Sequence, residues 1–72
     1  MRKETQHEKI IHYIERYGSI TPMDAFNDLG ITRLAARIHD IRMSGIAIQG
    51  EFEASTNRFG ETVHYMRYRR VG

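Results

Sequence analysis

Apolar residues in the first part of the chain recur at the spacing of a helix. Ile10, Ile14 and Tyr17 follow one another at steps of four and three, which places them on one helical face. A Thr-x-x-Glu capping box begins at Thr5, and a glycine suited to a left-handed cap follows Tyr17. These features predict a helix over residues 5–17.

A second helix start follows after only a few residues. Thr21 is suited to a helix cap, a proline follows at the first helical position, and an aspartate three residues later completes the capping signal. We expect a helix over residues 22–29, ended by a glycine, and one rung of sheet at Ser19-Ile20 before it. The side chains expected to be buried are Ala25, Phe26 and Leu29.

A third helix is predicted over residues 32–44, with Thr32 as its cap and a glycine after its end. Leu34, Ile38 and Ile41 lie at i, i+4 and i+7 and define its buried side. At about 100° per residue, a set of mostly polar residues falls on a different side of this helix. That set is Arg33, Ala36, Arg37 and Asp40.

After the third helix the hydrophobic period changes to two, which predicts a β-hairpin over residues 46–69. Its first strand alternates apolar and polar residues, with Gly50 interrupting the apolar side. Composition places the turn at residues 54–61, where Asn57 and Gly60 are able to adopt positive φ. Large apolar residues fall on both faces of the second strand, so its inward face stays open without a bulge. The two candidate sets are Val63 with Tyr65 and Met66 with Tyr68.

Length and composition narrow the class of protein. A chain of 72 residues with 40% hydrophobic and 28% charged residues is ordinary for one folded domain, which we expect to span residues 1–72. The chain has no cysteine, which excludes a disulfide framework, a thiolate metal site and a cysteine nucleophile. No apolar run approaches the ~20 residues of a membrane span, and residues 1–4 begin no signal peptide. We therefore expect a cytoplasmic protein with no cofactor, no metal and no catalytic activity.

The positive charge is concentrated in the second part of the chain. Residues 1–30 carry four basic and five acidic residues, a net charge of −1, whereas residues 31–72 carry seven arginines and four acidic residues, a net charge of +3. Arginine presents a planar fork of donors that matches phosphates and guanine edges. The same excess also occurs on ordinary solvated surfaces, so charge alone leaves both interpretations open.

The order of the elements carries the fold interpretation. A helix, one short strand, a short helix, a tight corner, an arginine-bearing helix and a hairpin predict an α+β fold. The second and third helices form a helix-turn-helix, in which Gly30 turns the chain, Ile31 fixes the corner and Leu34 anchors the next helix. The C-terminal hairpin adds a wing, so the sequence predicts a three-helix winged helix-turn-helix.

The third helix of this fold is a candidate DNA-binding element because it has the width to enter the major groove. Thr32 or the helix amides are expected at a phosphate, and Ala36 is short enough to touch a thymine methyl. Arg33 and Arg37 are expected at guanine or phosphate, while Asp40 either orients an arginine or accepts from cytosine. The helix therefore supplies five of the candidate contacts.

The hairpin supplies the other candidate contacts. Asn57 and Arg58 at its tip are expected along the backbone or in the minor groove. Arg67 and Arg69 belong to a chain end expected to be flexible and charged, from which they can neutralise phosphates. Two glutamates in the first strand argue against a hairpin that lies flat on the duplex, so we expect only its tip to lie close to DNA.

Most of the chain resembles a known family. The run over residues 20–42, with its Ile-Thr-Arg-Leu-Ala-Ala-Arg-Ile block, is similar to the small helix-turn-helix proteins of phages and prophages. The Asn-Arg-Phe-Gly turn at residues 57–60 and the Tyr-x-x-Tyr strand at residues 65–68 are similar to that family's C-terminal hairpin. The resemblance covers about residues 6–70, and it implies DNA binding in repression or excision-like roles.

The histidines and tyrosines admit other interpretations. His7 and His12 are five residues apart, not the four that place two metal ligands on one helix face, so exposed or packing roles are favoured. The four tyrosines can stack bases in a protein that binds single strands. Core packing is favoured instead, because Tyr13 and Tyr17 continue the apolar stripe of the first helix.

Two functions follow from these predictions. The first is a small protein that binds double-stranded DNA, as a phage or prophage transcriptional regulator or a recombination accessory. Such a protein is expected to act as a homodimer or tandem assembly, because one winged helix contacts few base pairs. The alternative is a winged helix that binds a host or phage protein. The net charge of only +2 and the mixed charges of the first helix favour this alternative.

Overall fold

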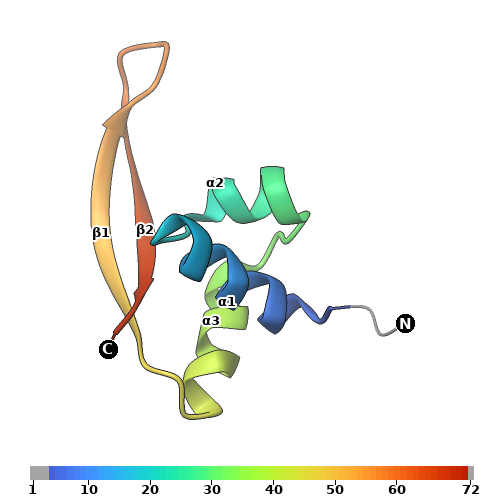
Figure 1. Cartoon of the computed structure of the whole chain (residues 1–72). Coiled ribbons are helices and arrows are strands. Elements are labelled where there is room, and N and C mark those ends of the chain that lie inside the picture. Colours follow the sequence, from blue (N-terminus) through green and yellow to red (C-terminus); the bar gives the residue numbers. More distant parts are fainter. Residues whose placement is uncertain (1–3, 72) are drawn as a thin grey trace.

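The computed structural model of the chain describes residues 4–71, with helices in the first part and a hairpin in the second (Figure 1). In chain order the elements are α1 (Gln6–Tyr17), α2 (Pro22–Asp24), the π-helical turn η1 (Ala25–Leu29), α3 (Leu34–Met43), β1 (Ile48–Thr56) and β2 (Thr62–Arg70). Segments α2 and η1 follow each other without a break, so they form the second of three helices. These helices and the antiparallel hairpin confirm the predicted α+β fold class.

Helix α1 forms where its capping signals place it. The hydroxyl of Thr5 accepts a hydrogen bond from the Glu8 amide at 3.2 Å, and the Glu8 carboxylate accepts one from the Thr5 amide at 3.3 Å. Gly18 ends the helix with a φ of 89° and donates its amide to the carbonyl of Ile14 at 2.7 Å. Ile10 and Ile14 are buried, so the predicted stripe faces the core.

Residues 22–29 are helical as predicted, but the helix changes from α to π form after Asp24. Ala25 and Leu29 lie about one turn apart and pack against the core. Phe26 directly follows Ala25, so its side chain points to the solvent side of the helix, where it is 57% exposed. The expected burial of Phe26 is therefore wrong, because so short a segment buries only positions that lie one turn apart.

The corner between η1 and α3 is longer than the sequence suggests. Gly30 takes a φ of 69° and Ile31 is buried, as predicted for the turn. Helix α3 begins at Leu34, and its cap residue is Arg33, whose side chain makes no capping hydrogen bond. The predicted cap at Thr32 is therefore wrong, because the backbone at Arg33 (φ −123°, ψ 61°) is not yet helical.

Strands β1 and β2 pair in one uninterrupted register, with Gly50 opposite Tyr68 and Phe52 opposite Met66. Tyr68 is buried and Met66 is partly buried against the core, so the face that carries these two residues is the inward one. The absence of a side chain at Gly50 leaves room for this packing: a Cβ there would lie 2.8 Å from Met66 Cε and 3.3 Å from the Tyr68 ring. Strand β1 begins at Ile48, two residues after the predicted start of the hairpin.

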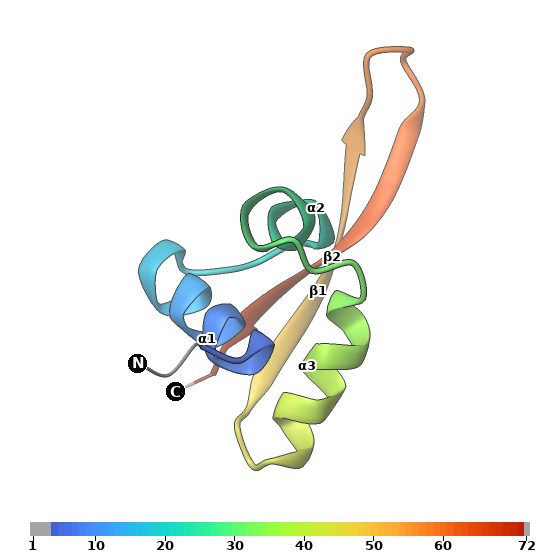
Figure 2. The same ribbon diagram turned by 90° about the vertical axis from the view of Figure 1, so that its right-hand side faces the viewer.

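One half of the hairpin packs against the helices, and the half that carries its turn extends beyond them (Figure 1, Figure 2). Ile20 forms a single bridge with Tyr68 through two backbone hydrogen bonds of 2.9 Å, as expected for one rung of sheet at this point. The largest fully buried side chains are Ile10, Ile20, Ile38 and Ile41. The core thus anchors the base of the hairpin and leaves its tip in solvent.

Candidate nucleic-acid interface

One edge of α3 carries an arginine and an aspartate that lie in contact, and the aspartate also lies close to a histidine of α1. The Arg37 guanidinium lies 3.5 Å from Asp40 Oδ2, and the same oxygen lies 3.7 Å from His7 Nε2 on α1. Because Asp40 is within reach of both partners, it holds Arg37 alongside the helix and connects this edge to α1. The contact corresponds to the orienting role expected for Asp40.

The amino end of α3 borders an open cleft of about 320 Å³. Its lining residues are Pro22, Thr32, Arg33, Leu34, Ala35 and Ala36. Arg33 is exposed, and no acidic side chain within residues 4–71 forms an ion pair with it. Since no side chain caps α3, the amides of its first turn remain available to an acceptor. Thr32, Arg33 and Ala36, all predicted contacts, therefore share one cleft with these amides.

The outward side of α3 includes two residues that sequence reasoning missed. His39 and Met43 are both exposed, and the exposed fraction of Met43 is 75%. Counting about 100° per residue from Leu34 places both of them across from the buried stripe, so the helical period could have found them. Arg42 instead supports the fold, because its Nε donates to the carbonyl of Ile48 at 3.0 Å.

The hairpin tip is held by the side chain of Asn57. Its Oδ1 accepts hydrogen bonds from the amides of Phe59 at 2.9 Å and Glu61 at 3.0 Å. Gly60 takes a φ of 77°, whereas Asn57 does not adopt the positive φ for which it was considered. Arg58 is exposed at this tip, and the part of the chain that the structure describes offers it no acidic partner. The tip therefore presents an unneutralised arginine from an ordered turn.

The predicted flexible chain end is an ordered strand. Arg69 Nε lies 3.6 Å from Glu51 Oε1 across the hairpin, and Arg70 donates to the Glu15 carboxylate on α1 at 2.9 Å. The expectation of a flexible end is wrong, because the sequence alone does not show which acids the strand register brings beside these arginines. The Arg69 pair is long and about half exposed, so this guanidinium remains accessible to solvent.

Arg67 is the most firmly held of the strand arginines. Its Nε donates to both carboxylate oxygens of Glu53, at 2.9 and 3.0 Å, and another guanidinium nitrogen donates to the hydroxyl of Ser19 at 2.9 Å. The hydrogen bonds from Arg67 lower the pKa of Glu53 below its ordinary value. Arg67 therefore ties both strands to the segment before α2, with its Nε and one of its two terminal nitrogens already engaged.

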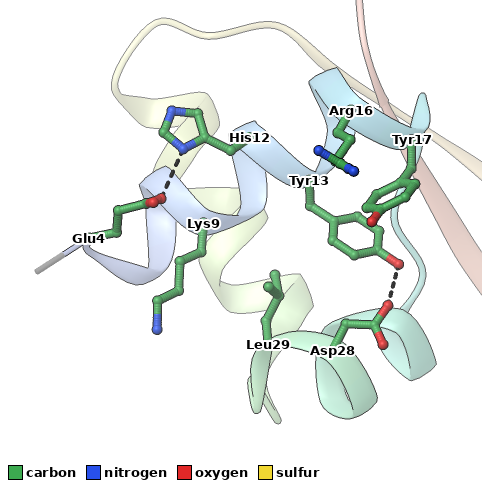
Figure 3. Close-up of a pocket in the computed structure, with 8 residues that line it drawn as sticks. All are labelled: Glu4, Lys9, His12, Tyr13, Arg16, Tyr17, Asp28 and Leu29. Atoms are coloured by element: carbon green, nitrogen blue, oxygen red, sulfur yellow. Dashed lines mark hydrogen bonds and ion pairs between the residues drawn. The ribbon is translucent and has the colours of Figure 1, made fainter.

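A second concavity of about 540 Å³ lies between α1 and η1 (Figure 3). The Tyr13 hydroxyl donates to Asp28 Oδ2 at 2.5 Å, and the rings of Tyr13 and Tyr17 are 4.6 Å apart. The pKa of Tyr13 is raised to about 12, mainly by the hydrogen bond to Asp28 and to a smaller extent by desolvation. Tyr13 packs against the core as expected, whereas Tyr17 is 62% exposed and lines the concavity instead.

Substitution of Tyr13→Phe is expected to change how stability depends on pH. The unfolded chain loses the phenol proton near its ordinary pKa of about 10, while the folded chain keeps it to about 12. The stabilisation is therefore complete below pH ~10 and is lost as the pH rises to about 12. Absorbance titration of phenolate should show a step near pH 12 that the variant lacks. Identical titration curves for the two proteins would contradict the assignment.

The remaining candidate chemistry does not gather into a site. Among residues 4–71, no three His, Cys, Asp or Glu side chains are arranged to hold a metal ion. His7 contacts Asp40, whereas His12 Nδ1 lies 2.8 Å from Glu4 Oε2. In the same part of the chain, no helix is long and apolar enough to cross a bilayer.

Comparison with known protein families gives a match over most of the chain. A family model described as a winged helix-turn-helix domain matches residues 5–69, which include every helix and nearly all of the hairpin. No curated protein and no solved structure gives a significant match. The assignment to a family therefore depends on the sequence pattern that this model describes, and the geometry described above agrees with it.

Proposed function

The chain belongs to the winged helix-turn-helix domain family, and we propose that it binds double-stranded DNA through α3 and the hairpin tip. Domains of this family are typically DNA-binding rather than catalytic. One observation carries the proposal: the amino end of α3 has an uncapped first turn beside an arginine without an acidic partner in residues 4–71. Both features attract the anionic backbone of a nucleic acid.

In this proposal the first turn of α3 enters the major groove. The free amides beside Thr32 bind a phosphate, and Arg33 binds a guanine edge or a neighbouring phosphate. Ala36 is only partly exposed and offers a small apolar surface to a thymine methyl. Arg37 is held by Asp40, so it approaches the bases with its guanidinium already oriented.

The hairpin contributes mainly through its tip. Asn57 fixes the turn that presents Arg58, and this arginine binds the backbone or the minor groove. Arg69 can leave its long, exposed pair with Glu51 to neutralise a phosphate. We assign Arg67 a supporting role instead of a phosphate contact, because Glu53 pairs with its charge and Ser19 accepts from a second nitrogen of its guanidinium.

The biological role proposed is that of a transcriptional regulator or recombination accessory in a phage or prophage, acting in the cytoplasm of the host. This part of the proposal depends on the resemblance of residues 20–42 to small phage proteins. A single α3 contacts only a few base pairs, and each mismatched pair typically costs ~1–3 kcal/mol. We therefore propose that the protein binds as a homodimer or as a tandem assembly.

Binding to a host or phage protein is the second candidate function. Phe52 is 72% exposed, although it lies opposite Met66 on the inward face of the hairpin. Met23 and Phe26 are exposed on α2 and η1. Large apolar side chains of this kind are more typical of protein contacts than of phosphate contacts.

Selection from randomised duplexes with the purified protein tests the DNA proposal. We expect one sequence to be enriched, with a half-site spacing that reports the assembly. Fluorescence anisotropy at two salt concentrations should then show affinity falling steeply with salt, as it does when arginines displace counterions. Absence of enrichment together with absence of binding at low salt would overturn the proposal in favour of a protein partner.

A further inference from the structure

The hairpin tip exposes an aromatic side chain that the contacts described above leave unused. Phe59 is 79% exposed, more than any other large apolar side chain among residues 4–71. It belongs to the turn between β1 and β2, which is the part of the molecule that projects farthest from the helices (Figure 1, Figure 2). A large ring in this position gains nothing from the core.

The exposure of Phe59 does not result from a loose turn. The Phe59 amide donates to Asn57 Oδ1 at 2.9 Å, and the amide of Gly60 donates to the Asn57 carbonyl at 3.0 Å. The Asn57 amide in turn donates to the carbonyl of Glu61 at 2.9 Å, which closes the loop at the ends of the strands. The backbone that carries the ring is thus already ordered, and a partner has little left to immobilise.

The charges around Phe59 indicate which kind of surface the ring contacts. Arg58 precedes it and has no acidic partner in the described residues. The one acid of the turn, Glu61, accepts from Asn57 Nδ2 at 3.3 Å and so faces the loop. The complementary surface must therefore offer a flat apolar face close to negative charge. Stacked bases beside phosphates have this combination, since every base has a π-face.

We propose that Phe59 is a wedge that inserts between two base pairs from the minor groove, with Arg58 on the flanking phosphate. Apolar wedges of this kind unstack a base step and bend the duplex away from the wedge, toward the major groove. The proposal rests on the DNA binding proposed above and adds an activity to it: the protein deforms its site as well as binding it.

The wedge makes a specific prediction for Phe59→Ala. Loss of the ring removes favourable stacking but also removes the cost of unstacking the step, so affinity is expected to change by less than about tenfold. The bend itself should be lost. A selected site carrying donor and acceptor dyes at its ends reports bending, and 2-aminopurine placed at successive positions reports the unstacked step. Both are measured with the DNA saturated by protein.

Two variants serve as controls. Phe59→Trp keeps a flat aromatic ring at the tip and should retain both the bend and the 2-aminopurine signal. Phe52→Ala removes a ring that is 72% exposed on the inward face of the same hairpin, and it should leave both signals unchanged. Circular dichroism checks that all variants keep the helices and hairpin, which is expected because both rings lie outside the core.

The possible outcomes distinguish failure of the wedge proposal from failure of the DNA-binding proposal. A Phe59→Ala variant that bends the saturated site as wild type does overturns the wedge and leaves DNA binding intact. Affinity lost by more than about a hundredfold also overturns it, because the ring would then supply binding rather than distortion. Wild-type protein that binds no duplex at low salt overturns the proposed function itself.

Discussion

Replacing Tyr68 by alanine is expected to lower the free energy of unfolding by about 3–5 kcal/mol. The ring is buried at the base of β2, against the opening left by Gly50, and its centre lies 5.9 Å from the guanidinium carbon of Arg42. A domain of this length is typically stable by about 4–11 kcal/mol, so the change removes a large part of the total. Urea denaturation followed by circular dichroism measures the loss.

The matched control is Tyr68→Phe, which keeps the ring and is expected to cost less than about 1.5 kcal/mol. Amide hydrogen exchange adds a local measurement, because the Ile20 amide donates to the carbonyl of residue 68 at 2.9 Å. Faster exchange at Ile20 in the alanine variant would show that the hairpin loosens at this bridge. Equal unfolding free energies for the two variants would contradict the anchoring role of the ring.

Helix starts and stops could be predicted because each depends on residues within one turn of chain. The cap formed by Thr5 and Glu8 is complete in four residues, and the left-handed φ of Gly18 needs only the absence of a Cβ. The same logic failed at Thr32. The backbone at Arg33 (φ −123°, ψ 61°) is not helical, so α3 begins one residue later, and no local rule for caps shows where the corner packs.

Features of the hairpin could not be predicted because they depend on contacts distant in sequence. The inward face of β2 follows from the packing of Tyr68 and Met66 against core residues of the helices, which are distant in sequence. The order of the last strand follows from acids that lie elsewhere in the chain, such as Glu53 for Arg67. A charged chain end is predicted to be flexible when its partners are unknown. In the structure, ion pairs with acidic residues hold this end in the strand.

The candidate site divides in the same way. The pair formed by Arg37 and Asp40 is local, three residues apart on one helix, and helical spacing predicts it. The approach of His7 from α1 to the same carboxylate depends on how two helices pack. The sequence identifies Phe59 only as part of a family-like turn, because sequence does not show that the tip projects into solvent.

Replacing Arg33 and Arg37 together by alanine is expected to reduce affinity for the selected site by at least about 30-fold, because each bidentate base contact supplies ~1–3 kcal/mol. Affinity for unrelated duplexes should fall less, since phosphate contacts elsewhere remain. Folding should be nearly unaffected: Arg33 has no acidic partner in residues 4–71, and the exposed pair of Arg37 with Asp40 is worth ~1 kcal/mol or less. Anisotropy titrations on both duplexes measure the ratio.

A charge-matched control distinguishes loss of contacts from loss of charge. The Lys9→Ala/Arg16→Ala variant also removes two positive charges, but from the concavity between α1 and η1. Long-range attraction falls equally in both double variants, so any additional loss in Arg33→Ala/Arg37→Ala belongs to α3. If the two variants lose the same affinity on every duplex, α3 contributes only charge, and base recognition must come from another surface. Retained discrimination between selected and unrelated DNA would lead to the same conclusion, because α3 is then not the element that distinguishes the bases.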